Sequence, residues 1–189
     1  IVRMLPTSGT AVINIDDERS ATIVPQLTGA MITYGWHETA TVRAEHATTT
    51  YDQYGLPSGM VVKIGVEGSV VPVALPGVIG RHQVLPLLAA VAVAKAVGLP
   101  ISDVMKNVSA YQPPAGRMRL LSGKHRSVIL DDSYNASPDA MEAAIRTLEE
   151  IHVPGRKMAI IGQMSELGAL TNEWHEKIGE MFGPKSLSL

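Results

Sequence analysis

Runs of apolar residues alternate along the chain with polar, turn-forming stretches, and their spacing predicts strands and helices. The run from Ser127 to Leu130 is short and β-rich, so it predicts a buried strand. Two aspartates follow, and then turn formers lead to Pro138, which suits the first turn of a helix that Ser137 is placed to cap. Apolar residues recur at helical spacing beyond Pro138. Strand, acidic turn and amphipathic helix in succession place polar groups at the carboxyl edge of a sheet, where α/β proteins bind ligands.

The first part of the chain predicts an α/β sheet that continues into antiparallel strands. Residues 11–15 form a strongly β-forming run that ends at Asp16 and Asp17, and 22–33 predicts a short helix and then a strand. From 40 to 75, β-rich segments are separated by closely spaced glycine turns. This pattern predicts an antiparallel meander.

A second informative stretch is an almost uncharged helix predicted over 83–97. Gly98 and Pro100 follow in the order that a helix end requires. Because the helix is apolar nearly all round, we expect it to be buried. A shorter helix is predicted over 102–109, and the sequence QPPAG at 112–116 is the strongest candidate for a domain boundary.

We therefore predict an α/β protein of two domains, 1–112 and 113–189. The first is a partial, β-rich domain with a buried helix, and the second is a partial Rossmann-like domain. In the second, strand 119–122 forms a hairpin with the strand described above, 157–161 is a buried parallel-type strand, and a helix runs from about 172 to 181.

Composition narrows the function classes. The chain has 189 residues, of which 46% are hydrophobic and 18% charged, so it can bury a core and is not disordered in composition. A net charge of −2 gives no reason to expect nucleic acid or an anionic membrane as partner. Without cysteine, no disulfide or thiolate metal site is possible. The sequence has no signal-peptide pattern and no apolar run long enough to cross a bilayer, so we expect a cytoplasmic protein without membrane insertion.

The loop DDSYNASPDAM at 131–141 carries a family resemblance. On its residues alone, a strand–loop–helix connection with two solvated aspartates explains it equally well. The string strongly resembles the corresponding loop of the Mur ligases, ATP-dependent enzymes that extend the peptidoglycan stem peptide, and most closely the form found in members that add D-alanyl-D-alanine. The resemblance implies that Asp132, or as second choice Asp131, contacts the ATP ribose. It also implies that Tyr134 and Asn135 line the cleft.

The stretch before the buried helix resembles the family's Gly-x-His-Asn-x-x-Asn motif, whose asparagines hold adenine. Gly80 and His82 match, whereas Gln83 and Pro86 replace the asparagines. Gln83 retains an amide that can serve adenine from a longer stem, but Pro86 has no donor. Considered alone, His82 at a helix start is as readily a cap as a ligand contact.

Two further segments match. PAGRM resembles the family's Pro-x-Gly-Arg, which implies that Arg117 faces the nucleotide phosphates; an interdomain salt bridge is the alternative. GQMSELG resembles Gly-Asp-Met-x-Glu-Leu-Gly, with Gln163 in place of aspartate. Glu166 and His175 fall on matching positions, where they contact the peptide substrate or serve as capping groups.

Other parts of the family pattern are absent from the sequence. It contains no Gly-x-x-Gly-Lys-Ser/Thr phosphate loop, and the lysine that the family carbamylates to bridge Mg²⁺ ions is missing too. Asn14 and Asp16 match the segment after the family's metal-binding stretch, and we expect them either to be structural or to support metal ligands, which lie mostly outside this chain. We expect a fragment, the end of a central ATPase domain plus the start of a C-terminal domain, that performs no ligation alone.

The resemblance implies a ligase that activates a carboxylate as an acyl phosphate, which an incoming amine attacks, with ATP and Mg²⁺ as cofactors. Its implied partners are UDP-MurNAc-tripeptide and D-alanyl-D-alanine, and we expect a monomer. Two alternatives are another Mur-type amino-acid ligase and a non-catalytic binding module, which the replacements at Gln83, Pro86 and Gln163 favour. The predicted catalytic residues are Arg117 and Asn135, and the predicted nucleotide-binding residues are His82, Gln83, Arg117, Asp131, Asp132 and Tyr134.

Overall fold

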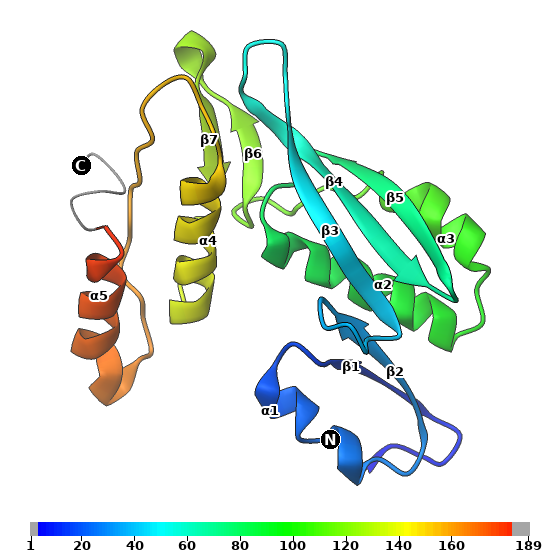
Figure 1. The fold of residues 1–189 in the computed structure, drawn as a ribbon. Coiled ribbons are helices and arrows are strands. Elements are labelled where there is room, and N and C mark those ends of the chain that lie inside the picture. Colours follow the sequence, from blue (N-terminus) through cyan, green and yellow to red (C-terminus); the bar gives the residue numbers. More distant parts are fainter. Residues whose placement is uncertain (1–3, 183–189) are drawn as a thin grey trace. The chain divides into compact units, whose positions relative to one another are not determined.

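The computed structural model describes residues 4–182, which divide into two compact units. Unit 1 contains the chain up to Thr48, Met60–Leu75 and Gln83–Tyr111; unit 2 contains Thr49–Gly59, Pro76–His82 and the chain from Gln112 onward. Helices and strands occur in both, so the predicted α/β class is confirmed (Figure 1). The domain limits at 112 and 113 stay a prediction.

A five-stranded sheet runs through the first part of the chain in the order β1-β2-β3-β4-β5. β1 pairs with β2 in parallel, and β2 pairs with the start of β3 in parallel. β3, β4 and β5 are neighbours in sequence order, as the meander prediction requires, and only antiparallel strands can be joined by so short a connection as Glu67–Gly68. The strands are β1 (Thr10–Asn14), β2 (Ala30–Gly35), β3 (Val42–Tyr51), β4 (Pro57–Val66) and β5 (Ser69–Pro76).

The buried helix is α2 (Val84–Ala96), which packs against β1, β2 and the following helix α3 (Ile101–Val108). Leu88 and Val91 of this helix are fully buried, as predicted from its apolar surface. Gly98 ends the helix in the left-handed conformation, at a φ of 76°. The N–H of Leu99 donates to the Ala94 carbonyl at 2.9 Å, which satisfies one of the helix's last carbonyls.

The acidic residues after β1 have structural roles, as expected. The Asp16 carboxylate accepts hydrogen bonds from the backbone N–H groups of Trp36 (2.8 Å) and His37 (2.9 Å), at the end of β2. Asp17 caps α1 (Glu18–Ala21) by accepting from the Arg19 N–H at 2.8 Å, and this bond is the main cause of the lowered pKa of Asp17. A 3₁₀ turn, η2 (Val24–Gln26), then leads toward β2.

Unit 2 contains the predicted hairpin of β6 (Arg119–Ser122) and β7 (Val128–Asp131), with Arg119 opposite Asp131. The prediction that β7 is buried is wrong, because Ile129 is 51% exposed on a sheet of only two described strands. Ser137 stands at the N-cap position of the following helix, but its side chain makes no capping hydrogen bond. The other elements are η3 (Arg81–Gln83), η4 (Lys124–Arg126), α4 (Pro138–Glu150), η5 (Gly168–Leu170) and α5 (Thr171–Glu180).

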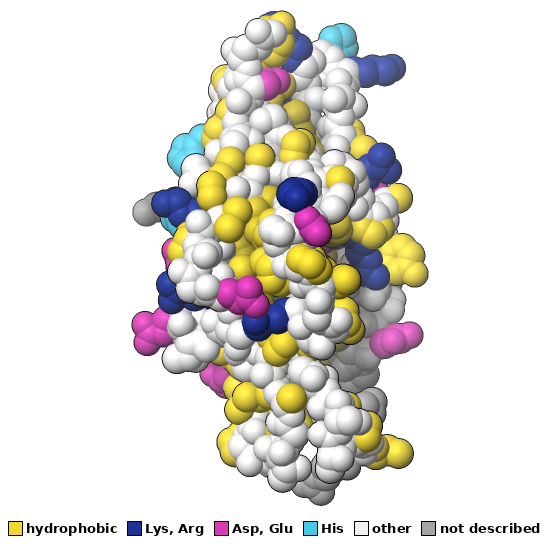
Figure 2. Space-filling view, turned by 90° about the vertical axis from the view of Figure 1, so that its right-hand side faces the viewer, with side chains coloured by type: hydrophobic (Ala, Val, Ile, Leu, Met, Phe, Trp, Pro, Cys, Tyr) yellow, Lys and Arg dark blue, Asp and Glu magenta, His cyan; other side chains and the backbone are white. Residues whose placement is uncertain are grey.

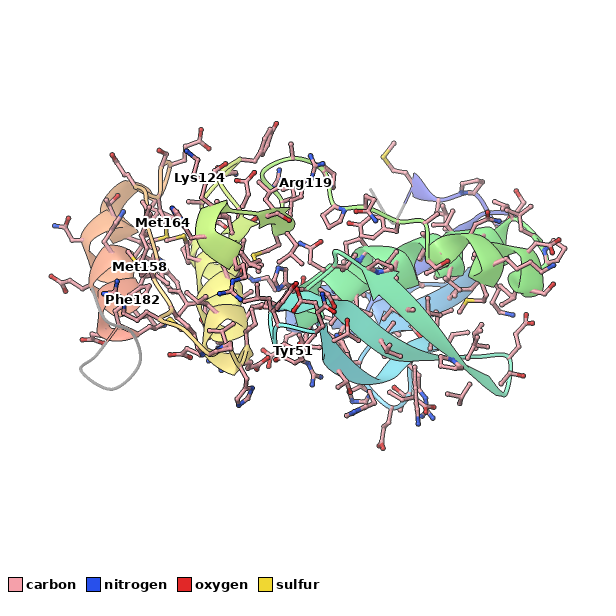
Figure 3. The ribbon with its side chains drawn as sticks, turned by 90° about the horizontal axis from the view of Figure 1, so that it is seen from above. Tyr51, Arg119, Lys124, Met158, Met164 and Phe182 are labelled. Carbon is pink, nitrogen blue, oxygen red and sulfur yellow. The ribbon has the colours of Figure 1, made fainter. Side chains whose placement is uncertain are left out.

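α4 and α5 enclose a small core of Ile145, Met164 and Ile178, against which Trp174 and Phe182 pack. The side chains of Met164 and Phe182 are seen beside α5 in Figure 3. α5 confirms the helix predicted near 172–181. This core is the main apolar contact between the two helices.

The strand predicted over 157–161 does not form. Met158 is 65% exposed, Ile160 is fully exposed and Ile161 is 43% exposed, on an extended connection between α4 and α5 (Figure 3). In the described part of the chain, the sheet of unit 2 offers β6 and β7 but no third strand. A strand needs a hydrogen-bonded neighbour, so a β-type pattern alone does not produce one here.

The surface has mixed charge. On the face in Figure 2, lysine and arginine side chains are interspersed with aspartate and glutamate. None of the helices within residues 4–182 has the length and apolar character needed to cross a membrane.

Candidate functional site

Two segments of unit 2 that are distant in sequence are fastened together by backbone hydrogen bonds. The Gly116 N–H donates to Asp131 Oδ2 at 3.2 Å, and the Met118 N–H donates to Asp132 Oδ1 at 3.0 Å. In return, the Tyr134 N–H donates to the Gly116 carbonyl at 3.1 Å. We call segments 116–118 and 131–135 together the Arg–Asp site. The structure therefore brings the predicted arginine and the predicted acidic loop to one place.

Arg117 stands between two residues in the left-handed conformation. Gly116 has a φ of 70°, and a Cβ added to it would lie 2.8 Å from the Tyr134 backbone nitrogen, so no larger residue fits. Met118 has a φ of 52° although it is not glycine, a strain of roughly 1–3 kcal/mol. Its side chain is only 1% exposed, and its burial together with the bond to Asp132 stabilises this backbone. The exposed Arg117 side chain is thus displayed from a tightly fixed turn.

The aromatic ring of Tyr134 lies beneath this arginine. The guanidinium carbon of Arg117 is 4.2 Å from the ring centroid, within the range of a cation–π contact. Tyr134 is 72% exposed, and the next residue in the loop, Asn135, is exposed as well. Both therefore lie at the surface of the Arg–Asp site.

The two aspartates of the site differ in how their oxygens are used. Asp131 Oδ1 accepts from the Ser133 hydroxyl at 2.6 Å and from the Ser133 N–H at 3.3 Å, while Oδ2 accepts from Gly116. The Ser133 hydroxyl is the largest cause of the lowered pKa of Asp131. Asp132 uses only Oδ1 for a hydrogen bond within the described residues. Asp132 is therefore the aspartate with an oxygen left for a ligand.

His82 belongs to the same unit and lies within electrostatic reach of the site. Burial lowers the pKa of His82, and the carboxylate of Asp132 opposes that shift. Gly80, with a φ of 96°, precedes it; a Cβ there would lie 2.8 Å from both Thr147 Oγ1 of α4 and His82 Cε1. A glycine is therefore required where this loop passes α4.

The other members of the predicted adenine motif lie in unit 1. Gln83 Oε1 accepts a long hydrogen bond of 3.5 Å from the Tyr111 hydroxyl. Pro86 falls in the first turn of α2, where its missing N–H disrupts no helical bond. The structure thus groups His82 with the Arg–Asp site and Gln83 with α2.

The His175 ring joins the loop at Met164 to the first residue of α5, Thr171, through two hydrogen bonds. Its Nε2 accepts from the Met164 N–H at 3.1 Å, so the proton must be on Nδ1, which donates to the Thr171 carbonyl at 2.7 Å. Both ring nitrogens are engaged. Glu166 is exposed in the left-handed conformation, with a φ of 64°.

Unit 2 also has a cavity of about 320 Å³ between the β3–β4 turn and the β6–β7 hairpin. None of the residues of the Arg–Asp site lines it. The Asp52 Oδ1 in its wall is engaged by the N–H groups of Tyr54 (2.8 Å) and Leu56 (2.9 Å), and Arg126 stacks 5.7 Å from the Tyr54 ring. The polar groups of this cavity are thus largely paired within the protein.

Three residues that shape the Arg–Asp site were not predicted from the sequence, namely Ser133, Gly116 and Met118. The spacing of Asp131 and Ser133 is a usable signal, because aspartate side chains commonly accept from residues two positions on. Gly116 is marked by the sequence only as a boundary glycine. Nothing in the sequence signals the left-handed conformation of Met118.

The fold and this arrangement define a class. Because β6 and β7 are antiparallel, the turn that precedes β6 brings the arginine to the carboxyl end of β7, where the two aspartates lie, and the histidine is within electrostatic reach of them. α/β proteins commonly bind ligands beyond the carboxyl ends of their strands. Residues 116–187 match the family described as Mur ligase, glutamate ligase domain. This segment therefore belongs to the Mur ligase family.

Two of the similar proteins in that family share one name. UDP-N-acetylmuramoyl-tripeptide–D-alanyl-D-alanine ligase of Mycobacterium tuberculosis (strain H37Rv) is 30% identical over 182 residues, 94% of this chain and 34% of the relative. Its namesake from Bacillus subtilis (strain 168) is 33% identical over 110 residues, 58% of this chain and 24% of the relative. The chain thus spans about a quarter to a third of the length of these relatives.

Solved structures of two proteins are similar in fold to this chain over most of its length. MurF from Acinetobacter baumannii has a TM-score of 0.81 and 26% identity, covering 96% of this chain and 38% of that one. MurF ligase from Thermotoga maritima, solved in complex with ADP, has a TM-score of 0.77 and 27% identity, covering 91% and 37%. Another Mur ligase, the 2,6-diaminopimelate ligase of Vibrio parahaemolyticus, is 30% identical over 93% of this chain and 34% of its own length.

Proposed function

We propose that this chain is part of an ATP-dependent ligase that joins D-alanyl-D-alanine to UDP-MurNAc-tripeptide. The observation that carries the proposal is the fastening of segments 116–118 and 131–135, which sets Arg117 beside Asp132. A relative with this ligase name aligns over 94% of the chain, and a similar solved structure is described as a complex with ADP. The Arg–Asp site then binds the nucleotide.

Each side chain has a task that suits its chemistry. Arg117 offers a permanently charged fork of donors to the phosphates, while the open oxygen of Asp132 accepts from a ribose hydroxyl. His82 lies at the same site, and the exposed amide of Asn135 orients the reacting groups. A role for the Gln83 amide in holding adenine stays a prediction. ATP supplies the phosphoryl group that makes a substrate carboxylate an acyl phosphate, which the incoming amine then attacks.

Neither magnesium binding nor triphosphate cradling is assigned to this chain. No three His, Asp or Glu side chains within residues 4–182 come together as a metal site, so that part of the chain offers Mg²⁺ no such cluster of ligands. The sequence also has no phosphate loop. We therefore expect weak nucleotide binding and no ligation by this chain alone. A cytoplasmic location and a monomeric state remain predictions.

Titration of the isotope-labelled chain with ADP tests the nucleotide role. We expect backbone amide shifts at His82, Arg117 and Asp132, and affinity reduced roughly ten- to hundredfold in Arg117→Gln, because a charge-assisted contact is lost. Arg126→Gln is the matched control, since this arginine of the same unit lines the cavity between the β3–β4 turn and the β6–β7 hairpin, which no residue of the Arg–Asp site lines. Shifts confined to that cavity, or none at millimolar ADP, would contradict the proposal.

The genomic reading frame separates the ligase from the non-catalytic module that the replacements at Gln83, Pro86 and Gln163 favour, whereas a turnover assay tests whether this chain ligates alone. With ATP, Mg²⁺, UDP-MurNAc-tripeptide and D-alanyl-D-alanine, we expect no product from this chain. A phosphate-loop sequence encoded upstream of Ile1 in the same frame supports the ligase. An upstream frame without that loop supports the module.

A further inference from the structure

One face of the Tyr134 ring is already occupied. The Arg117 guanidinium carbon lies 4.2 Å above the ring centroid, although both side chains are exposed. Two exposed side chains would ordinarily move independently in water. Their contact is therefore imposed by the backbones that carry them.

The backbone fixes this contact from both sides. The Tyr134 N–H donates to the Gly116 carbonyl. Because Gly116 is left-handed and has no Cβ, segments 116–118 and 131–135 approach to a distance that any Cβ would block. On the far side of Arg117, the bond from Met118 to Asp132 holds a second left-handed residue. The start of the arginine side chain and the start of the tyrosine side chain are thus held at a set separation.

We propose that Tyr134 is a positioning residue for Arg117 and does not itself stack on the nucleotide base. Its ring supports the guanidinium in the place where phosphates are bound. This inference rests on the proposed function and changes the role that the family resemblance implied for Tyr134.

The benefit is entropic. Arginine has a long, flexible side chain, and immobilising such a side chain on binding opposes affinity. A guanidinium already stacked on a ring loses less freedom when it meets a phosphate, and stacking leaves the N–H donors at its edge available. The gain applies only to ligands that use Arg117, so it depends on the phosphates and not on the base.

Ring-current shifts test the contact without any ligand. In the unmodified chain the Arg117 side-chain protons resonate upfield, because they lie over the ring. Tyr134→Leu removes the upfield shift, and Tyr134→Phe preserves it. An Arg117 shift that is unchanged in Tyr134→Leu would overturn the proposal.

Binding of ADP and of adenosine then tests the role. Tyr134→Leu should weaken ADP binding about two- to fivefold, as expected for an exposed cation–π contact, while adenosine binding is unchanged. Tyr134→Phe should restore ADP binding. Tyr54→Leu is the matched control, because it breaks the other arginine–tyrosine contact of unit 2, and it should leave ADP binding unaltered.

The outcomes separate this proposal from the one on which it rests. Equal losses for ADP and adenosine would show that Tyr134 contacts the base, and undiminished ADP binding in Tyr134→Leu would show that Arg117 needs no support; either overturns the proposal. If the unmodified chain binds no ADP, the nucleotide function fails first, and the positioning role fails with it even where the ring-current shift is present.

Discussion

Unit 1 and the helical part of unit 2 are stabilised in different ways. In unit 1, α2 packs on β1 and β2, and its Leu88 and Val91, like Val62 and Ile64 of β4, are fully buried. In unit 2, the cluster between α4 and α5 has only three buried members in the described chain, Ile145, Met164 and Ile178. Side-chain hydrogen bonds to the backbone supplement it there. The comparison teaches that polar fastenings carry a larger share of the stability where the apolar cluster is small, although unit 1 has such a fastening too, at Asp16.

The largest effect is expected in unit 1. Leu88→Ala should lower the free energy of unfolding by about 2–5 kcal/mol, because it removes a fully buried side chain and leaves a cavity. Val93→Ala on the same helix is the control, since Val93 is 49% exposed and should cost much less. Urea unfolding followed by circular dichroism measures both. Equal losses would show that α2 is not the core of this unit.

A second, smaller effect is expected at the polar fastening of His175. His175→Leu introduces an apolar side chain of similar size and leaves the Met164 N–H and the Thr171 carbonyl without their partner, a loss of about 1–3 kcal/mol. The control is His152→Leu, an exposed histidine in the same unit. Hydrogen exchange should also quicken at the Met164 amide. If both variants unfold alike, unit 2 relies on its apolar cluster after all.

The sequence was informative where a local pattern was matched by local partners. The helix over 83–97 was predictable because its glycine end and its uninterrupted apolar surface agree, and the hairpin before Asp131 because both strands are close in sequence. The strand over 157–161 was not, since its apolar pattern needs a neighbour that the described sheet lacks. At the site, the family resemblance singled out Arg117 and Asp132, and the structure places them together, while their roles stay predictions. Residue types gave no sign of the backbone of Met118, which depends on contacts across the chain.

Residues 158–161, which pair with no strand in the described chain, sharpen the comparison between the packed sheet of unit 1 and the helical part of unit 2. Ile160→Lys should change the free energy of unfolding by less than about 0.5 kcal/mol, because Ile160 is fully exposed. Amides at 158–161 should exchange rapidly with solvent, whereas those of Val62 and Ile64 in β4 should be protected. A loss of several kcal/mol in Ile160→Lys would mean that this segment is packed as a strand in solution.

The smallest expected effect concerns a single proton at the Arg–Asp site. Burial holds the pKa of His82 below its ordinary value near 6.5, and Asp132 raises it in opposition. Asp132→Asn should therefore lower the pKa of His82 further, which a proton NMR titration of the His82 ring measures. Asp139→Asn, at an exposed position on α4, is the control and should leave that pKa in place.

Asp132→Asn should also change how the free energy of unfolding depends on pH. Because the folded state favours neutral His82, the unfolded chain binds the proton more readily below pH 6.5, and stability falls as the pH falls from there through the folded-state pKa. Lowering that pKa widens the pH range over which the loss accumulates. The difference in unfolding free energy between Asp132→Asn and the unmodified chain should thus grow between pH 7 and pH 5, as read from urea unfolding at each pH. A constant difference would mean that His82 and Asp132 do not interact, and it would remove the histidine from the site.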